Sequence, residues 1–293
     1  NGGRANNGRR SSIIRKGPWT MKRIVAGLLT LALLVGGLAG CAREPAPEGT
    51  LTVTVLDVGK ADCILIQESA GGAMLIDTGT RESASAILEF LRARGIDTLE
   101  TLLLTHMDKD HIGGAAAILQ AVKAERVVQP GASKDSGEYT AYQAALREKG
   151  IEPEMLWKAE RADLGGAVVT LIPGRELSYK QSNDYSVFTE ITYGDHRFLF
   201  TGDGEKKRLQ EYLDGRPDPC DFLKVPHHGR AEKNSEAFFE AVAPRYAVIT
   251  CSEEEPPEDE VLALLKAAGA KTYLTSGGIV TAVSDGRTLT VTQ

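Results

Sequence analysis

The sequence has few histidines and few cysteines, and beyond residue 40 it has no long apolar run. The 293 residues include five histidines and four cysteines, the latter at positions 41, 63, 220 and 251. No two cysteines have the CxxC spacing, which disfavours a cysteine-based metal or redox motif. No period of 20 to 50 residues is visible either, which disfavours a repeat array.

Positive charge is also scarce once the first forty residues are set aside. The formal net charge is −6, but residues 1–40 carry seven basic side chains and no acidic ones. The remaining 27 basic and 40 acidic residues give a net charge of −13. Because nonspecific binding to nucleic acid depends on Lys and Arg neutralising phosphates, we expect no strong nonspecific DNA binding. A local basic patch at a cleft is compatible with this charge.

Residues 21–40 have the composition of an export signal. Met21 is followed by two basic residues, by a short apolar run at 24–35, and by Leu38-Ala39-Gly40-Cys41. This order is typical of a cleaved signal rather than of a spanning helix. The last four residues resemble a bacterial lipobox, which implies a lipoprotein anchored outside the cytoplasm through lipidated Cys41. An uncleaved membrane anchor is the alternative, and it predicts the same location.

The rest of the chain is expected to form an N-terminal segment, a linker and one domain. Residues 1–20 contain no methionine and are polar, so we expect them to lie upstream of the true start and to be unstructured. Residues 41–49 form a polar linker that includes two prolines. A single domain at 50–293 follows. We expect Cys63, Cys220 and Cys251 to be small buried residues, with at most one disulfide among them.

Apolar periodicity predicts alternating groups of strands and helices in this domain. Alternation or short apolar runs predict strands at 51–57, 63–67, 73–76, 102–104, 127–128, 168–172, 187–193, 197–200, 222–225 and 246–250, with further short strands up to Val291. Helical spacing predicts helices from Ser83 to a stop at Gly95 and at 113–122, 139–148, 205–213, 235–242 and 258–268. Strands in groups with helices between them favour two mixed sheets packed face to face and flanked by helices.

Four of the five histidines lie in two short loops, each directly after an apolar strand. His106 and His111 belong to the first loop, and His227 and His228 belong to the second. Loops at strand ends are where rigid scaffolds display functional groups. The sequence therefore predicts that both loops contribute to one site.

The first loop has the composition of a metal site. In residues 105–111, the alternating His106, Asp108 and Asp110 can point to one side, while His111 points toward a neighbouring space. Imidazole and carboxylate groups are suitable ligands for zinc, manganese or iron. The alternative is a solvated acidic loop with incidental histidines. Asp203, after the 197–200 strand, and the loop at 226–229 favour the metal site.

At this point the chain resembles the metallo-β-lactamase superfamily, and within it the hydrolase domain of ComEC-type competence proteins, which take up DNA. The resemblance covers nearly all of residues 51–293. Its landmarks in this sequence are Leu56-Asp57-Val58-Gly59-Lys60-Ala61-Asp62, Ile76-Asp77-Thr78-Gly79, residues 105–111, Ser182-Asn183-Asp184-Tyr185-Ser186-Val187, Phe200-Thr201-Gly202-Asp203 and Leu223-Lys224-Val225-Pro226-His227-His228-Gly229. The resemblance implies a four-layer αββα sandwich.

The resemblance also implies a site with two divalent metal ions, Zn or Mn. His106 and Asp108 would bind one ion, Asp110 and His111 the other, and Asp203 would bridge them. His228 would be the last ligand, with His227 as the alternative ligand or as a group that acts on the leaving group. Asn183 lies where many relatives place a third histidine for the first ion, so it would be a weaker ligand there.

Several residues near these motifs have two interpretations. Lys224 could stabilise charge on a phosphate or carbonyl, or form a salt bridge. Arg230 stands where relatives usually have serine and could bind an anion or be a surface charge. Asp57, Asp62 and Asp77 are expected to be buried supports that orient ligands. His196 is expected to lie on the surface, at a hairpin turn.

The resemblance implies a metal-dependent phosphodiesterase or nuclease that acts on a nucleic-acid-like substrate. Two ions would lower the pKa of a trapped water, with Asp110 holding the nucleophile. Asp108 in place of a histidine makes the site harder, which favours manganese as a competitor to zinc. The alternatives are hydrolysis of another ester, such as a choline phosphate, a wall polymer or a lactam, and a non-catalytic binding protein with the same fold. The oligomeric state stays open.

Overall fold

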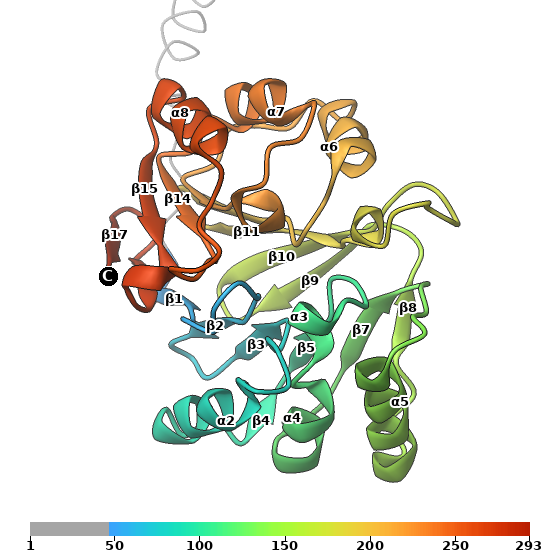
Figure 1. The fold of residues 1–293 in the computed structure, drawn as a ribbon. Helices are drawn as coiled ribbons and strands as arrows, with labels where there is room; N and C mark the ends of the chain where they lie inside the picture. Colours follow the sequence, from blue (N-terminus) through green and yellow to red (C-terminus); the bar gives the residue numbers. More distant parts are fainter. Residues whose placement is uncertain (1–46) are drawn as a thin grey trace, which may run out of the picture. The chain divides into compact units, whose positions relative to one another are not determined.

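The computed structural model describes residues 47–293, so the expected export signal at 21–40 and Cys41 lie outside the described residues. Within residues 47–293, two large sheets pack face to face, and helices cover the outer face of each sheet (Figure 1). The predicted αββα sandwich of two mixed sheets is therefore confirmed. Its four layers follow from the alternation of strand groups and amphipathic helices in the sequence.

The first sheet has the strand order β17-β16-β1-β2-β3-β5-β7-β8. Its strands are β1 (Leu51–Val55), β2 (Ile64–Glu68), β3 (Ala73–Ile76), β5 (Thr101–Leu103), β7 (Val127–Pro130), β8 (Glu154–Leu156), β16 (Val280–Ser284) and β17 (Leu289–Thr292). The strands β3, β5, β7 and β8 are parallel neighbours. A small parallel pair, β4 (Thr98–Leu99) and β6 (Lys123–Ala124), lies beside it.

The second sheet has the strand order β15-β14-β13-β12-β11-β10-β9. Its strands are β9 (Glu160–Leu164), β10 (Ala167–Ile172), β11 (Phe188–Tyr193), β12 (His196–Phe200), β13 (Phe222–Lys224), β14 (Tyr246–Ile249) and β15 (Lys271–Leu274). The strands β12, β13, β14 and β15 are parallel, and the rest of this sheet is antiparallel.

Helices cover the two sheets on opposite sides (Figure 1). The α-helices are α2 (Ala84–Ala93), α3 (Lys109–Ile112), α4 (Ala115–Ala121), α5 (Gly137–Lys149), α6 (Lys206–Leu213), α7 (Ser235–Val242) and α8 (Asp259–Ala267). Three short 3-10 helices are η2 (Asn183–Tyr185), η3 (Pro226–Gly229) and η4 (Thr275–Gly277). None of the helices within residues 47–293 is long and apolar enough to cross a bilayer.

Three hydrophobic clusters hold these layers together. One lies between the sheets and includes Phe198, Phe200 and Phe222, whose rings contact one another at tilted angles. The second joins the first sheet to α2, α4 and α5, and the third joins the second sheet to α6, α7 and α8. Residues 47–293 thus contain their own cores, so we expect this part of the chain to fold alone. Cys63, Cys220 and Cys251 are free and buried in it.

Most predicted elements are present, and the exceptions have a physical reason. The strands β8 and β9 were not predicted, because β8 has only three residues, of which one is buried, and β9 consists mainly of exposed or half-buried residues, three of them charged. Both are sheet edges, where short, charged strands discourage pairing with other chains. The first strand ends at Val55 rather than at Asp57. The short helix α3, which was not predicted, lies within the loop expected to bind metal.

Candidate metal centre

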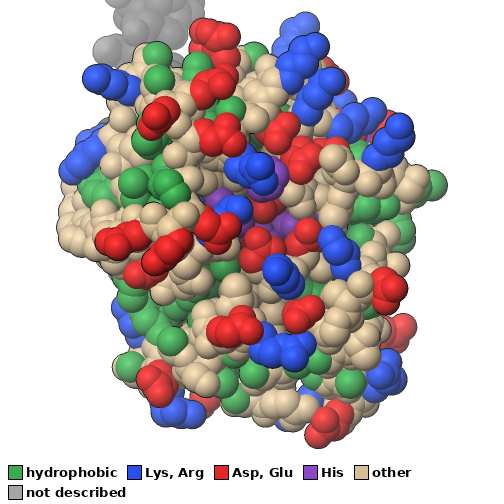
Figure 2. Space-filling view, viewed as in Figure 1, with side chains coloured by type: hydrophobic (Ala, Val, Ile, Leu, Met, Phe, Trp, Pro, Cys, Tyr) green, Lys and Arg blue, Asp and Glu red, His purple; other side chains and the backbone are tan. Residues whose placement is uncertain are grey.

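The parallel strands deliver the predicted site residues to one place. Asp77 follows β3 and His106 follows β5, which are neighbours in the first sheet. Asp203 follows β12 and His228 follows β13, which are neighbours in the second sheet. The carboxyl ends of parallel strands meet at one edge of a sheet. In Figure 2, histidine atoms lie in a hollow that is rimmed by acidic and basic side chains.

Four of the predicted ligands form a tight cluster. Asp110, His111, Asp203 and His228 each offer one ligand atom, and these atoms all lie within 4.8 Å of one another. The Nε2 atoms of His111 and His228 lie 3.3 and 3.2 Å from the two oxygens of Asp203. His228 Nε2 also lies 3.6 Å from Asp110 Oδ2. Two imidazoles and two carboxylates are a donor set suited to a divalent transition metal.

Several of these atoms lack a protein partner. Nε2 of His106, His111 and His228 and Oδ1 of Asp203 are buried and form no hydrogen bond. Buried polar atoms are nearly always paired, because leaving them unpaired costs about 1–3 kcal/mol each. A divalent ion would satisfy these atoms, so the residues present fit the metal that the sequence predicts.

Supporting side chains fix the orientation of the two histidines. The Nδ1 of His111 lies 2.7 Å from Asp77 Oδ2, and Asp77 also accepts hydrogen bonds from the backbone and the hydroxyl of Thr105. The Nδ1 of His228 lies 2.8 Å from Thr250 Oγ1, and this hydroxyl donates to Asp62 Oδ1 at 2.7 Å. Each pair leaves Nε2 as the atom available to an ion.

The backbone is strained at the same place. His227 and His228 have φ angles of 48° and 53°, and Asp77 has a φ of 58°. Non-glycine residues in this left-handed region cost of order 1–3 kcal/mol each and cluster at functional sites. Two successive left-handed residues after Pro226 turn both histidine side chains toward neighbouring parts of the site.

Electrostatics also indicate a place for a cation. Burial would lower the pKa of His111, but Asp203 and Asp77 raise it well above its ordinary value. Burial would raise the pKa of Asp203, but His228 and His111 hold it well below its ordinary value. Burial lowers the pKa of His106 to about 3, so this imidazole is neutral at pH 7. A metal ion at Nε2 of His111 would therefore replace a proton.

Of the ligands expected for the first ion, His106 and Asp108 lie close enough for each to shift the pKa of the other. The ring of His106 also lies beside that of His111, with centroids 4.1 Å apart and the planes tilted by 50°. Asp108 accepts hydrogen bonds from Lys134, at 2.7 Å, and from the hydroxyl of Ser182. The side chain of Asn183 forms its hydrogen bonds with Glu205 and His227, and none with His106 or Asp108. The cluster of four corresponds to the second expected ion, and the first expected site is sparser.

Asn183 belongs to a neighbouring cluster around His227. It donates to Glu205 Oε1 at 3.0 Å, and its Nδ2 lies 3.2 Å from His227 Nε2. With Asn183 in this orientation His227 carries its proton at Nδ1, which lies 3.8 Å from Glu205 and 3.6 Å from Glu232. Burial lowers the pKa of His227 to about 4, so the imidazole is neutral.

The sequence analysis missed Glu205 and Glu232. Glu205 lies two residues after Asp203 and could have been noticed from that spacing. Glu232 lies in a polar loop where nothing in the sequence distinguishes it. Burial raises the pKa of both carboxyls, and the charge of Glu232 adds to this at Glu205, as the charge of Asp184 does at Glu232.

Lys224 is a buried structural cation. Its side chain is fully buried, its Nζ lies 2.5 Å from Asp62 Oδ2 and 3.5 Å from Asp203 Oδ1, and it donates to the carbonyl of Gly202. Burial would lower its pKa, but Asp62 and Asp203 raise it. The salt bridge that the sequence left as an alternative is thus what the structure shows. A direct role on substrate does not fit this position.

Three other expectations are corrected or resolved. Asp62 and Asp77 are buried as expected, but Asp57 is exposed and supports no ligand. The surface position expected for His196 is wrong, because this residue is 5% exposed and its Nδ1 lies 2.7 Å from Ser284 Oγ. Alternating strand residues face opposite sides of a sheet, and residue 196 faces inward. Arg230 is exposed, and its Nε lies 3.8 Å from Glu258.

Comparison with known proteins now identifies the family. Residues 56–252 match the family described as the metallo-beta-lactamase superfamily. The chain belongs to this superfamily. Together with the candidate metal site, this membership identifies the chain as a metal-dependent hydrolase.

The relatives of this member of the metallo-β-lactamase superfamily include ComEC-type competence proteins, as the motifs indicated. The chain is 29% identical over 236 residues to ComE operon protein 3 of Bacillus subtilis, covering 73% of this chain and 30% of the relative. It is 30% identical over 212 residues to Recombination protein 2 of Haemophilus influenzae, covering 71% of this chain and 25% of the relative. The chain thus spans a quarter to three-tenths of these relatives.

A solved structure supports the fold. The metallo-beta-lactamase fold protein YhfI from Bacillus subtilis matches with a TM-score of 0.54 and 12% identity. The match covers 78% of this chain and 98% of that protein. At this identity the likeness shows the shared fold alone.

Metal binding should depend on Asp203 far more than on nearby exposed acids. Asp203→Ala removes the carboxylate that both clustered histidines contact, so we expect Zn²⁺ or Mn²⁺ affinity to fall more than about 100-fold. Asp77→Asn, which removes only the support of His111, should cost about 10–100-fold. Titration of metal-free protein measures both. Asp57→Ala is the control and should bind as the parent does; equal affinity in Asp203→Ala would refute the cluster as the metal centre.

Replacement of Lys224 should reduce folding stability. Lys224→Met leaves Asp62 and Asp203 buried with uncompensated charge, which costs about 3–5 kcal/mol of unfolding free energy. Urea unfolding in EDTA measures this loss, and adding Asp62→Asn to Lys224→Met should recover part of it. If Lys224→Met unfolded at the parent's urea concentration and lost only turnover, the side chain would act on substrate instead.

Proposed function

We propose that this chain is an exported, lipid-anchored phosphodiesterase or nuclease. The observation that carries the proposal is the cluster of Asp110, His111, Asp203 and His228 with its unpartnered buried nitrogen and oxygen atoms. The relatives add support, because ComE operon protein 3 and Competence protein ComA of Neisseria gonorrhoeae are named for competence.

The four clustered residues would hold one ion, with His106 and Asp108 available to a second. When bound, divalent ions supply Lewis acidity, which activates water at neutral pH and draws charge from phosphoryl oxygens. Zn²⁺ and Mn²⁺ both suit the donors, and the carboxylate of Asp108 favours the harder ion. The support of His111 by Asp77 and of His228 by Thr250 keeps the donors in place before any ion arrives.

Asp110 is placed to handle the attacking water. Its side chain is 27% exposed, whereas the other three members of the cluster are at most 4% exposed. Burial would raise its pKa, but His228 and His111 lower it, so the carboxylate is ionised. An ionised carboxylate at the open side of the cluster can orient a water and accept its proton.

His227 is placed beside the cluster with a proton on Nδ1. Asn183 holds Nε2, and Glu205 and Glu232 face the protonated nitrogen. The side chain is 13% exposed, but Nδ1 itself is buried. Because the neutral ring carries its one proton on this buried atom, we assign His227 no direct proton transfer to the leaving oxygen. In this scheme Lys224 acts indirectly, by fixing Asp62 and Asp203.

Hydrolysis of a lactam or another ester is the second candidate. Lys134 forms a salt bridge with Asp108 at the site. An anionic substrate could take the place of Asp108 as the partner of this lysine. The reacting phosphoryl group of a diester is itself anionic, whereas the reacting carbonyl of a lactam is neutral even where a carboxylate stands elsewhere on the molecule. This contact favours phosphodiester cleavage.

A substrate screen tests the activity directly. Protein from Pro47 onward is incubated with Zn²⁺ or Mn²⁺ and with bis-p-nitrophenyl phosphate, single-stranded DNA or nitrocefin. We expect cleavage of the two diesters, and we expect Asp110→Ala and His228→Ala to reduce kcat/KM to background while circular dichroism stays unchanged. Turnover of nitrocefin alone would refute the phosphodiester assignment, and full activity in both variants would refute the site.

The lipid anchor is tested on the full chain in a bacterial host. Labelled fatty acid should attach to the protein, and Cys41→Ser should abolish the label and release the protein from the membrane fraction, because the proposed acceptor thiol is gone. Cys220→Ser, which alters a buried thiol of the folded domain, is the control and should keep the label. Labelling that survives Cys41→Ser would contradict the anchor.

A further inference from the structure

The edge of the first sheet continues beyond the metal centre. The parallel strands β3, β5, β7 and β8 are consecutive neighbours, so their carboxyl ends form one row. Asp77 follows β3, the metal-binding loop follows β5, Lys134 lies in the loop after β7, and Trp157 directly follows β8. Neighbouring strands are about 4.8 Å apart, so β8 lies about 10 Å from β5.

Trp157 is exposed but fixed. It is 58% exposed, which is unusual for so large an apolar ring. A Cβ added at Gly131, in the loop after β7, would lie 1.9 Å from the ring. The ring therefore packs against Gly131, where any side chain would clash with it. One part of the ring therefore rests on the β7 loop, while more than half of the residue's surface faces solvent.

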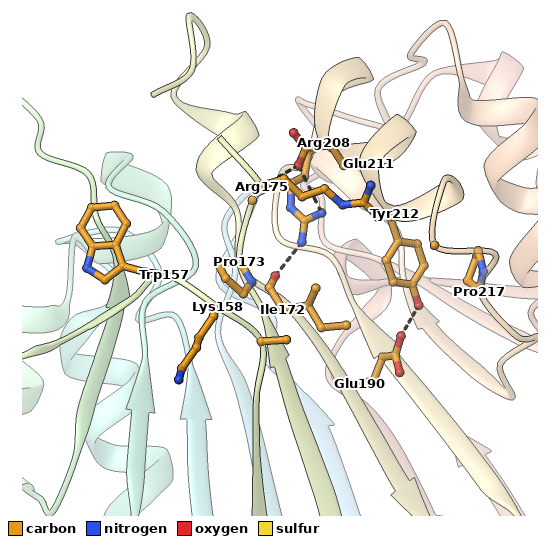
Figure 3. Close-up of a pocket in the computed structure, with 13 residues that line it drawn as sticks. Trp157, Lys158, Ile172, Pro173, Arg175, Glu190, Arg208, Glu211, Tyr212 and Pro217 are labelled. Carbon is orange, nitrogen blue, oxygen red and sulfur yellow. Dashed lines mark hydrogen bonds and ion pairs between the residues drawn. The ribbon is translucent and has the colours of Figure 1, made fainter. Parts of the chain in front are cut away.

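A pocket of about 390 Å³ opens beside this tryptophan (Figure 3). Trp157 and Lys158 lie on one side of it, and Arg175, Arg208 and Tyr212 lie on the other. Trp157 also lines a smaller pocket with Tyr179 and Tyr185. Two tyrosines therefore share this smaller pocket with the tryptophan.

Contacts connect this region to the metal centre. Tyr185 belongs to η2, which begins directly after Ser182, and the hydroxyl of Ser182 donates to Asp108. Lys134 approaches the same carboxylate from the β7 loop, with 2.7 Å between Nζ and Oδ1. The row of side chains thus runs from the metal loop through Lys134 to Trp157.

The charges of the pocket leave a net positive surface. Glu190 is engaged by the hydroxyl of Tyr212 and by Arg197, and Glu211 accepts hydrogen bonds from Tyr179 and the Arg175 backbone. By contrast, within residues 47–293 the structure gives the side chains of Lys158 and Arg175 no acidic partner. Both are exposed. Two cations without an acidic partner thus lie on the same pocket as an exposed indole.

We propose that Trp157, with Lys158 and Arg175, is a binding platform for single-stranded nucleic acid that extends from the metal centre. The proposal rests on the phosphodiesterase function and names its substrate class. Proteins that bind single strands combine a positively charged groove with aromatic side chains on which bases stack. Stacking on Trp157 needs an unpaired base, so a single strand fits and a duplex does not. Lys134 would receive a phosphate between the platform and the metal loop.

The tryptophan provides its own reporter. The chain has two tryptophans, at positions 19 and 157, so protein from Pro47 onward contains Trp157 alone. Metal-free protein in EDTA is titrated with oligothymidylate while the indole fluorescence is recorded. We expect quenching that saturates. A duplex of the same length should cause much weaker quenching, and equal quenching by the duplex would overturn the single-strand assignment.

Variants separate stacking from charge, with affinity measured by the anisotropy of a labelled oligonucleotide. Trp157→Ala should weaken binding about tenfold, and Trp157→Phe, which keeps an aromatic face, should stay within about threefold of the parent. The double variant Lys158→Ala with Arg175→Ala should reduce the slope of log K against log salt by roughly 1.4, since each phosphate contact on a single strand contributes about 0.7. The controls are Ile279→Ala, another exposed apolar residue, and Lys123→Ala, another exposed lysine; both should match the parent.

The outcomes distinguish this proposal from the proposed function. Unchanged affinity in Trp157→Ala, or a wall polymer that quenches Trp157 where oligothymidylate does not, would overturn the platform. Cleavage of bis-p-nitrophenyl phosphate by the parent would leave the proposed function standing in that case. Conversely, quenching by oligothymidylate with no diester cleavage in any metal would support the platform and overturn the phosphodiesterase.

Discussion

The structure depends on one buried carboxylate where the two sheets meet. Asp203 comes from the second sheet and lies 3.3 Å from His111, which comes from the first. It also lies within 3.5 Å of Lys224 and His228. A carboxylate with 3% exposure is costly unless it is paired, so these positive partners are a condition for folding as well as for metal binding. The site thus couples both halves of the sandwich.

Neighbouring side chains in the site have different roles. Buried supports such as Asp77 and Thr250 orient the histidines, and Lys224 balances the negative charge behind them. The partly exposed Asp110 and His227 face the region where a substrate would enter. The strained backbone at His227 and His228 is compatible with this division, because it places two adjacent imidazoles in different surroundings.

Much of this could be predicted from the sequence because local pattern and chemistry agree. Apolar strands that end in histidine and aspartate indicated both the sandwich and the loops that meet. The edge strands β8 and β9 were not predictable from periodicity, because β8 is only three residues long and β9 carries three charged residues and a single fully buried one. The burial of His196 and the exposure of Asp57 depend on which side of a strand or loop each faces, and neither motif contains that information.

The site shows the same limit. The sequence of residues 105–111 was enough to predict which residue types bind metal. The partner of each side chain, however, depends on tertiary contacts. From the sequence, Lys224 could have faced either a substrate or a carboxylate. Only the packing of the folded chain shows that its partner is Asp62. Glu232 and Asn183 meet at His227 from segments far apart in the chain, so no spacing rule relates them.

The most direct test of the central claim is anomalous X-ray diffraction from crystals of residues 47–293 soaked in Mn²⁺ or Zn²⁺. The account predicts an anomalous peak about 2.0–2.2 Å from Nε2 of His111 and His228 and from a carboxylate oxygen of Asp203. A peak confined to Glu205, His227 and Glu232, or no peak among the four clustered residues, would contradict it.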